Sequence, residues 1–405
     1  MKNNTVQKNI PSGWRKTSLG SLATRLKTGG TPTSTNKSFY GGEIPFVKID
    51  DMTTSGKYLS STVNFISDEG LKNSSAWLVP MDSILYSIYA TVGEVSINKI
   101  DVATNQAIMG VVVDEKEADR DYLYQYLLFL KPSLKKFFKE TTQKNLTSQI
   151  VKDLEIYIPN SKTEQQKIAE ILGKVDENIL KTQEVIEATE KLKRGLMQQL
   201  FTNGFENIKF DVVPLGTVAK VQGGYSFSSS DFSNSGTPVL RISNIKNGYI
   251  VLDDIKFYPK EITKRIATFL LNKNDVVVAM SGATTGKIGI VVETDLPLLI
   301  NQRVGRFVPT EKIDEKYLYN IVISDFYQKR IWDYAIGGAQ PNVSGPQLES
   351  IEIPLPNISI QKKIAEILSA VDEKILVNKK LKEKLTFLKK GLMQDLLSGT
   401  VRINI

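Results

Sequence analysis

Two segments of the chain carry apolar residues at the alternating four- and three-residue spacing of an amphipathic helix. Residues 163–200 begin this pattern at Ile168 and Leu172, and residues 359–396 repeat it from Ile364 onward. A helix of ~37 residues would be ~55 Å long and would depend on packing for its stability. The simplest arrangement pairs the two segments with each other as an antiparallel intramolecular coiled coil.

The apolar seam of each predicted helix has a polar interruption. Thr182 and Thr189 fall within the first seam, and Asn378 falls within the second. Polar residues at such positions can set the register or orientation of paired helices. The alternative is a frayed or partly exposed helix centre.

The two helical segments are close copies of each other at an offset of 196 residues. Lys-Ile-Ala-Glu-Ile-Leu occupies residues 167–172 and 363–368, and Gly-Leu-Met-Gln occupies residues 195–198 and 391–394. Across the first helix, from Gln165 onward, 20 of 36 positions match their offset partners. A duplication of this kind decides the architecture before any single element does.

The segments upstream of the helices also correspond, but more loosely. Leu19-Gly20 aligns with Leu215-Gly216, and Asn105-Gln106 aligns with Asn301-Gln302. Both segments are rich in short β runs, and each ends in a helical stretch, at 122–138 and 317–334. The sequence therefore predicts an α+β protein in which two similar mixed α/β globules alternate with two long helices in a pseudo-twofold repeat. The expected boundaries are 1–160 and 207–357 for the globules, and 161–206 and 358–405 for the helices.

Two absences from the composition restrict the chemistry. The chain of 405 residues contains no Cys and no His, which removes thiol nucleophiles, thiolate metal sites and the most common general base. The longest apolar runs are far shorter than the ~20 residues that span a bilayer, and the first residues form no signal-peptide core. We therefore expect a cytoplasmic protein and favour a binding role.

The net charge is compatible with nucleic acid but does not require it. Of the formal +8, residues 358–405 contribute +5, from ten basic and five acidic side chains. A solvated basic helix face explains this excess equally well.

Motifs for catalysis by the chain itself are weak or missing. Gly282-Ala-Thr-Thr-Gly286-Lys287 faintly resembles a phosphate loop, but it is one residue short and Ile288 replaces the Ser or Thr. The Asp/Asn-Pro-Pro-aromatic motif of amino-methyltransferases does not occur, and no nuclease-type carboxylate cluster stands out. We expect no catalytic residues, no metal site and no cofactor in this chain.

Two variable globules alternating with two near-identical helices resemble the specificity (S) subunit of type I restriction–modification systems. The order and duplication of the motifs above carry the resemblance, together with Gln-x-Asn-[Leu/Val]-[Thr/Ser] and a Pro-Asn pair before each helix. The resemblance covers essentially the whole chain. It implies that the globules are target recognition domains, that each reads half of a bipartite asymmetric DNA site, and that the helices set the spacing.

The resemblance also implies partners and their cofactors. Two methyltransferase (M) subunits would dock on the chain, and restriction (R) subunits can join them. S-adenosylmethionine would be bound by the methyltransferase partner, and ATP and Mg by the restriction partner. The present chain would then be non-catalytic, and double-stranded DNA would be its own ligand.

Candidate DNA-binding residues are polar or basic side chains on predicted turns, where Asn or Gln reads adenine and Arg or Lys reads guanine. They are Lys48, Thr91, Asn105, Gln106, Lys144 and Asn145 in the first globule, and Arg241, Asn244, Thr285, Lys287, Gln302 and Arg303 in the second. The alternative for each is a solvated loop residue or a turn-stabilising hydrogen bond. That alternative is strongest for residues that both globules share. Residues that differ, such as Lys287 against Glu94, are better candidates for specificity.

Candidate partner-docking residues lie near the end of each helix. Leu196, Met197, Leu392 and Met393 are duplicated, and adaptable Met side chains suit partner surfaces. The alternative is packing within the helix pair.

Three other hypotheses remain open at this stage. A two-headed scaffold that binds proteins would show weak DNA binding without a steep salt dependence. A self-contained enzyme using carboxylates or Lys would turn over substrate alone. A specificity subunit that has lost its partners would have the same sequence features.

Overall fold

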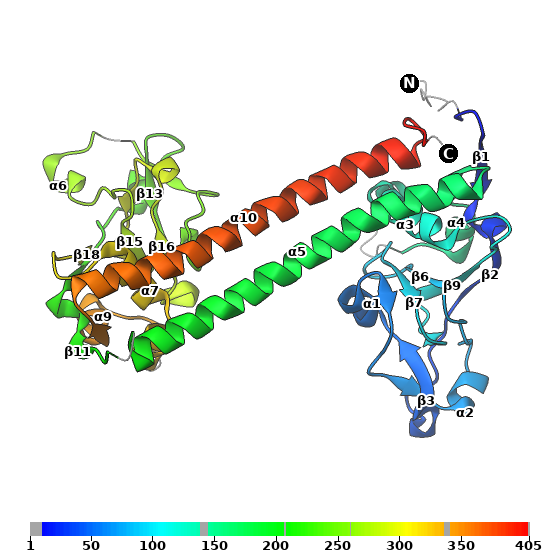
Figure 1. Ribbon diagram of the computed structural model, residues 1–405, viewed down its shortest axis with the longest axis horizontal. Helices are drawn as coiled ribbons and strands as arrows, with labels where there is room; N and C mark the ends of the chain where they lie inside the picture. The colour runs from blue at the N-terminus through cyan, green and yellow to red at the C-terminus, as the bar shows by residue number, and fades with distance from the viewer. Residues whose placement is uncertain (1–9, 138–144, 206–207, 260, 336–340, 404–405) are drawn as a thin grey trace. The chain divides into compact units, whose positions relative to one another are not determined.

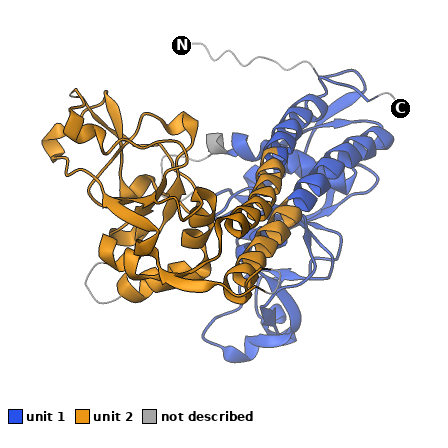
Figure 2. Ribbon diagram, turned by 60° about the vertical axis from the view of Figure 1, so that its left-hand side comes forward, with its two compact units in different colours: residues 1–182, 381–405 blue, residues 183–380 orange. Residues whose placement is uncertain are grey.

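The computed structural model describes residues 10–137, 145–205, 208–259, 261–335 and 341–403 (Figure 1). The chain divides into two compact units: unit 1 holds residues 1–182 and 381–405, and unit 2 holds residues 183–380 (Figure 2). The long helices α5 (Lys162–Asn203) and α10 (Ile358–Leu397) each contribute one part to each unit. The two mixed α/β globules and the two long helices confirm the predicted fold class.

Among its described residues, the globule of unit 1 contains three sheets and short helices. The largest sheet has the strand order β2-β9-β6-β7-β4, a smaller one has the order β5-β3-β8, and β1 pairs with β10. Their bounds are β1 Trp14–Ser18, β2 Ala23–Thr28, β3 Tyr40–Val47, β4 Tyr58–Leu59, β5 Phe65–Ile66, β6 Ile84–Ser87, β7 Val95–Asn98, β8 Ala103–Thr104, β9 Ile108–Val113 and β10 Glu155–Pro159. The α-helices are α1 Ile49–Ser55, α2 Asp68–Lys72, α3 Arg120–Leu130 and α4 Ser148–Lys152.

The globule of unit 2 repeats this plan. A four-stranded sheet has the order β12-β18-β15-β16, a three-stranded sheet has the order β14-β13-β17, and β11 pairs with β19. The bounds are β11 Asp211–Pro214, β12 Ala219–Gly223, β13 Thr237–Leu240, β14 Lys256–Tyr258, β15 Val276–Ala279, β16 Ile288–Ile290, β17 Leu299–Ile300, β18 Val304–Pro309 and β19 Glu352–Leu355. The α-helices are α6 Lys264–Ala267, α7 Glu315–Ile323, α8 Asp325–Ala335 and α9 Gly345–Ser350.

One predicted helix is two helices in the structure. The stretch 317–334 was expected to be continuous, but it breaks at Ser324 between α7 and α8. The Ser324 hydroxyl donates to the carbonyl of Ile321 at 2.6 Å and accepts from the amide of Tyr327 at 3.3 Å. Its side chain therefore offers the backbone an alternative to a continued helix, as serine does at helix boundaries.

Within each unit the two long helices run antiparallel. In unit 1, Asp176 Oδ1 and Lys389 Nζ are 2.5 Å apart. In unit 2, Asp372 Oδ2 and Lys193 Nζ are 2.7 Å apart. Asp176 and Asp372 are repeat equivalents, and so are Lys193 and Lys389, at the same offset of 196 residues. The structure thus forms the same interhelical ion pair twice, with the roles of the two helices exchanged.

Each globule is joined to its helix by the same polar contacts. The Oε1 atoms of Gln165 and Gln361 accept from the amides of Asp119 at 2.6 Å and Asp314 at 2.8 Å. Both glutamines are buried, and the Nε2 atom of each donates to a backbone carbonyl before its helix at 2.8 Å. Because a buried polar group is costly unless it is paired, these contacts fix where each globule sits on the start of its helix.

Tyrosines from α3 and α7 lie beside the interhelical ion pairs. Burial and the nearby Asp372 carboxylate raise the pKa of the Tyr319 hydroxyl to about 12. Burial raises the pKa of Tyr124 as well, with Asp176 adding to the effect. Both hydroxyls therefore stay neutral at physiological pH and act as parts of the packing.

The C-terminal segment closes unit 1. Arg402 donates from Nε and Nη2 to the two carboxylate oxygens of Glu164, at 2.7 and 2.8 Å. Trp14 Nε1 donates to the same carboxylate at 3.3 Å, and Arg402 also donates to the carbonyl of Ser12. Glu164 is only 2% exposed, so this carboxylate depends on its partners from both terminal segments.

No helix among the described residues is both long enough and apolar enough to cross a membrane.

Candidate nucleic-acid interface

In the first globule, a parallel strand pair places two predicted DNA-binding residues at one edge of a sheet. Val47 of β3 faces Thr104 of β8, so Lys48 and Asn105 follow their strands side by side, and the amide of Asn105 donates to the carbonyl of Val47 at 3.2 Å. Lys48 is exposed and extended, at φ −113° and ψ 169°, and precedes α1.

The second globule builds the same edge. Leu240 of β13 faces Ile300 of β17 in parallel, and the amide of Asn301 donates to the carbonyl of Leu240 at 3.0 Å. Arg241 occupies the position of Lys48 with nearly the same backbone, at φ −111° and ψ 162°. A basic side chain thus stands at the same point in both globules.

Two further loops lie beside this edge in each globule. In the first, the amide of Ile88 donates to the carbonyl of Ala107 at 2.8 Å, and the amide of Leu146 donates to that of Ile88 at 2.9 Å. In the second, Met280 takes the place of Ile88. Its amide donates to the carbonyl of Arg303, and its carbonyl accepts from the amide of Val343, both at 2.9 Å. We call these three adjacent loops the loop row: 105–107, 88–93 and 145–146 in the first globule, and 301–303, 280–287 and 341–343 in the second.

The shared Asn-Gln pairs mainly build the loop row. Gln106 Oε1 accepts from the Thr31 hydroxyl, and Gln302 Oε1 accepts from the Ser226 hydroxyl at 2.7 Å. Asn105 Oδ1 accepts from the amide of Ala107 at 3.1 Å. These bonds are the turn-stabilising alternative that the sequence left open.

Glycine pairs at the ends of β2 and β12, Gly29-Gly30 and Gly223-Gly224, permit this close packing. A Cβ on Gly29 would lie 2.1 Å from the carbonyl oxygen of Thr104, and a Cβ on Gly224 would lie 2.2 Å from that of Asn301. Any side chain would push these loops away from the strand ends, so both positions require glycine.

Two of the predicted DNA-binding residues do not reach the surface. Asn244 and Thr285 are each 2% exposed. Asn244 accepts from the amide of Arg241 at 3.1 Å and donates to two backbone carbonyls, and Thr285 Oγ1 donates to the carbonyls of Gly282 and Pro341. These hydrogen bonds within the fold account for both side chains, and a direct contact of either with DNA stays a prediction.

The remaining candidates are accessible. Lys48, Thr91, Asn145 and Arg303 are exposed, and Lys287 is half-buried. Lys144 lies outside the described residues. Within the described ranges, no group of three or more His, Cys, Asp or Glu side chains is placed to hold a metal ion. The loop row therefore offers hydrogen-bonding and cationic groups at a surface.

Two residues that sequence reasoning missed stand beside the basic side chains. Lys48 Nζ donates to Asn64 Oδ1 at 2.8 Å. Arg241 Nη2 donates to the carbonyl of Asp254 at 2.6 Å and lies 3.4 Å from its Oδ2. Asn64 and Asp254 differ in type, so comparing the two halves of the chain carried no signal for them.

The predicted docking residues are partly or fully covered. Met197 is 6% exposed within the core of unit 2, and Leu196 packs against that core. Leu392 and Met393 pack against the core of unit 1. Packing within the fold, the alternative interpretation, accounts for these contacts, and a role of the four residues in docking a partner stays a prediction.

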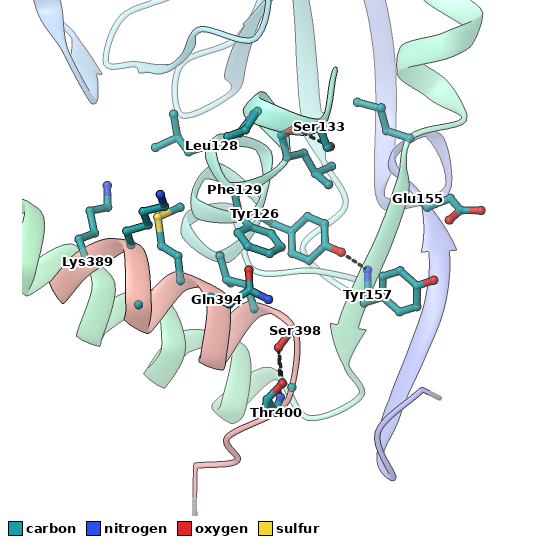
Figure 3. Close-up of a pocket in the computed structure, with 18 of the residues that line it drawn as sticks. Tyr126, Leu128, Phe129, Ser133, Glu155, Tyr157, Lys389, Gln394, Ser398 and Thr400 are labelled. Atoms are coloured by element: carbon teal, nitrogen blue, oxygen red, sulfur yellow. Dashed lines mark hydrogen bonds between the residues drawn. The ribbon is translucent and has the colours of Figure 1, made fainter. Parts of the chain in front are cut away.

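Met393 also lines a groove in unit 1 between α3, β10 and the end of α10 (Figure 3). The groove has a volume of about 1500 Å³. Tyr126 lies along it, and its hydroxyl accepts from the amide of Tyr157 at 3.0 Å. Phe387, also in the lining, is 80% exposed. Phe387 has Lys191 as its repeat equivalent, so this apolar lining residue is not duplicated.

A different apolar surface is duplicated. Val185 and Leu192 of α5 are 40% and 56% exposed, and their equivalents on α10, Leu381 and Leu388, are 44% and 49% exposed. Residues seven apart lie on the same helix face. We call these the α5 patch (Val185, Leu192), in unit 2, and the α10 patch (Leu381, Leu388), in unit 1.

A repeated globule with a loop row on each copy, carried by duplicated helices, is the arrangement of a two-headed recognition subunit. The chain belongs to the family of the type I restriction modification DNA specificity domain, whose model matches residues 11–190 and again 207–386.

Relatives with assigned names agree with this membership. The chain is similar to the type I restriction enzyme MjaVIII specificity subunit of Methanocaldococcus jannaschii, with 30% identity over 97% of this chain and 94% of that protein. It is also similar to the HindI specificity subunit of Haemophilus influenzae, with 30% identity over 46% of this chain and 42% of that protein.

A solved structure shares the fold along the whole chain. The crystal structure of the type I restriction–modification system S subunit from M. genitalium superposes with a TM-score of 0.60 at 19% identity, covering 100% of this chain and 99% of that one.

Proposed function

We propose that this chain is the non-catalytic DNA-specificity subunit of a type I restriction–modification complex. Each globule reads one half of a bipartite, asymmetric site in double-stranded DNA, and the two long helices set the gap between the halves. The observation that carries the proposal is the loop row, which both globules build on equivalent strand ends and backbone hydrogen bonds but with different polar side chains. One scaffold with two sets of readers suits two different half-sites.

The basic residues of the loop row and of the strand edge beside it support a role in DNA binding. Lys48, Lys287 and Arg303 can contact phosphates or guanine, and Arg241 stands at the position of Lys48. Phosphate attraction is the same for every DNA sequence, so it does not by itself select a target. Selection of a target then rests on the side chains in which the two globules differ.

The chemistry belongs to partners. Two methyltransferase subunits dock on the chain and bring S-adenosylmethionine, and restriction subunits that join bring ATP and Mg. The α5 and α10 patches support two equivalent docking sites, because each presents the same pair of apolar positions on a different helix. They replace Leu196, Met197, Leu392 and Met393 as the centre of the proposed contact.

The function is tested by mapping methylated adenines in the source genome with and without this gene. A two-part motif with a fixed gap should be present in the wild type and vanish on deletion. An unchanged map from a strain in which the methyltransferase is active would contradict the proposal. It would favour the alternative of a two-headed protein scaffold, whose DNA binding lacks a steep salt dependence.

Charged substitutions in the two patches should remove partners one at a time. L192E or L388E alone should lower the methyltransferase content of the purified complex from two subunits to one, and the double variant should retain none. Losing a leucine that the interface buries costs about 2 kcal/mol of binding free energy, which is roughly thirtyfold in affinity. Burying the introduced charge weakens binding further. Native mass spectrometry of the complex reads out the stoichiometry.

Leu180 provides the matched control for this substitution. It is a 58% exposed leucine on α5, but by helical geometry it faces away from Val185 and Leu192. L180E should leave two methyltransferase subunits bound. Retention of both subunits by the L192E/L388E double variant would show that the patches are not the docking surface.

A further inference from the structure

The basic residue at the edge of each globule has a different kind of partner. Lys48 donates a hydrogen bond to the amide oxygen of Asn64. Arg241 donates to the backbone carbonyl of Asp254 and lies beside its carboxylate. The two sites are otherwise equivalent, because each basic residue is extended and follows the first strand of a parallel pair. The hydrogen-bonding character that each pair shows to a ligand must therefore differ.

The first pair presents two donors, the Nζ atom of Lys48 and the Nδ2 atom of Asn64. An ammonium group has donors and no acceptor, so the Asn64 amide turns its oxygen toward Lys48. The amide nitrogen, Nδ2, then points away from Lys48 and donates to no acceptor among the described residues. The backbone of Asn64 is fixed, since its amide donates to Thr62 Oγ1 at 3.2 Å and its carbonyl accepts from Phe46 at 2.8 Å. Nζ and Nδ2 are thus adjacent donors on a rigid base.

The second pair presents a donor beside an acceptor. The Arg241 guanidinium carries only donors, and the Asp254 carboxylate next to it carries only acceptors. The Asp254 side chain is 85% exposed, whereas that of Arg241 is 29% exposed. The carboxylate oxygens therefore remain available to a ligand while the backbone carbonyl of Asp254 anchors the guanidinium.

Base edges in the major groove match these two patterns. Guanine shows two adjacent acceptors, N7 and O6, whereas adenine shows an acceptor at N7 and a donor at N6. We propose that Lys48 with Asn64 reads a guanine in one half-site, and that Arg241 with Asp254 reads an adenine in the other. This inference rests on the proposed DNA-reading function and identifies Asn64 and Asp254 as specificity-determining residues.

The test exchanges the two patterns. Chromosomal alleles encoding N64D and D254N are introduced separately, and methylated adenines are mapped in each strain. N64D should replace guanine by adenine at one position of one half-site, with the ratio of the two bases changing by at least about tenfold. D254N should make the opposite replacement at one position of the other half-site. N64A, which removes a donor without adding an acceptor, should relax the first position instead.

Matched controls carry the same change of charge elsewhere. Asn73→Asp adds a carboxylate to an exposed residue of the first globule, and Asp253→Asn removes one beside Asp254; neither should alter the motif.

A motif unchanged in both N64D and D254N would overturn the proposal, as would a change in both half-sites at once. Loss of all methylation in both N64D and N64A, with each chain still folded, would also overturn the proposal. The Asn64 amide would then be needed for the structure of the site and not for the choice of base. A wild-type strain with no gene-dependent bipartite motif would instead refute the proposed function.

Discussion

Seven residues inserted into both long helices should lengthen the gap in the recognised site by about three base pairs and leave both half-sites unchanged. A heptad adds ~10.5 Å to a helix, and base pairs are ~3.4 Å apart along DNA. The insertions belong after Thr182 and after Lys380, where the chain passes between the two units. Placed there, they keep Asp176 with Lys389 and Lys193 with Asp372, because each ion pair lies within one unit.

Methylation mapping should show the original motif fall to background and a longer motif appear. A heptad is chosen because it returns each helix face to nearly its starting direction. As a control, the heptad in α5 alone leaves α10 too short to match it, and we expect the complex to lose methylation at both motifs. Altered half-sites with an unaltered gap would show that the helices do not set the spacing.

Removing the guanidinium of Arg402 should destabilise unit 1 by about 2 kcal/mol. Breaking a buried ion pair costs about 3–5 kcal/mol because one charge is left uncompensated, and the Glu164 side chain is 3% exposed. The side chain of Arg402 is 40% exposed, so water can partly replace it and lowers the cost. For a unit of this size, R402A should lower the melting temperature by roughly 5 °C, as calorimetry would measure.

The origin of this loss can be separated by a second change. E164Q added to R402A removes the uncompensated charge and should recover most of the stability. R15A, which breaks an ion pair with the exposed Glu117, should change the melting temperature by less than about 1 °C, because exposed pairs contribute little. Equal melting temperatures for R402A and the wild type would mean that Glu164 is hydrated despite its burial.

The helices and the repeat could be predicted because their signals are local and long. Seam residues such as Ile168 and Ile364 keep a strict spacing, and both are fully buried. The interhelical register could not be assigned to the right residues. Thr182 and Thr189 were candidates for setting it, with a frayed helix centre as the alternative, but each hydroxyl donates at 2.6 Å to a carbonyl of its own helix. The ion pairs of Asp176 and Asp372 join the helices instead.

The candidate site was predictable in position but not residue by residue. The duplication indicated which loops of the two globules are equivalent, because equivalent sequences fold alike. Burial of a single polar side chain depends on contacts remote in sequence, as when Thr285 donates to the carbonyl of Pro341. Such contacts leave no local pattern. The same limit applies to Asn64, whose meeting with Lys48 follows from the pairing of β3 with β5.

The exchanged ion pair has a consequence for the ancestry of the gene. Each pair joins an aspartate of one repeat to a lysine of the other, so a single repeat already carries both halves of the contact. Two copies of an ancestral half-length chain would have formed both pairs as a symmetric homodimer. Such a dimer would recognise a palindrome. Fusion of two copies into one reading frame would then have let each globule mutate independently, and the target would have become asymmetric.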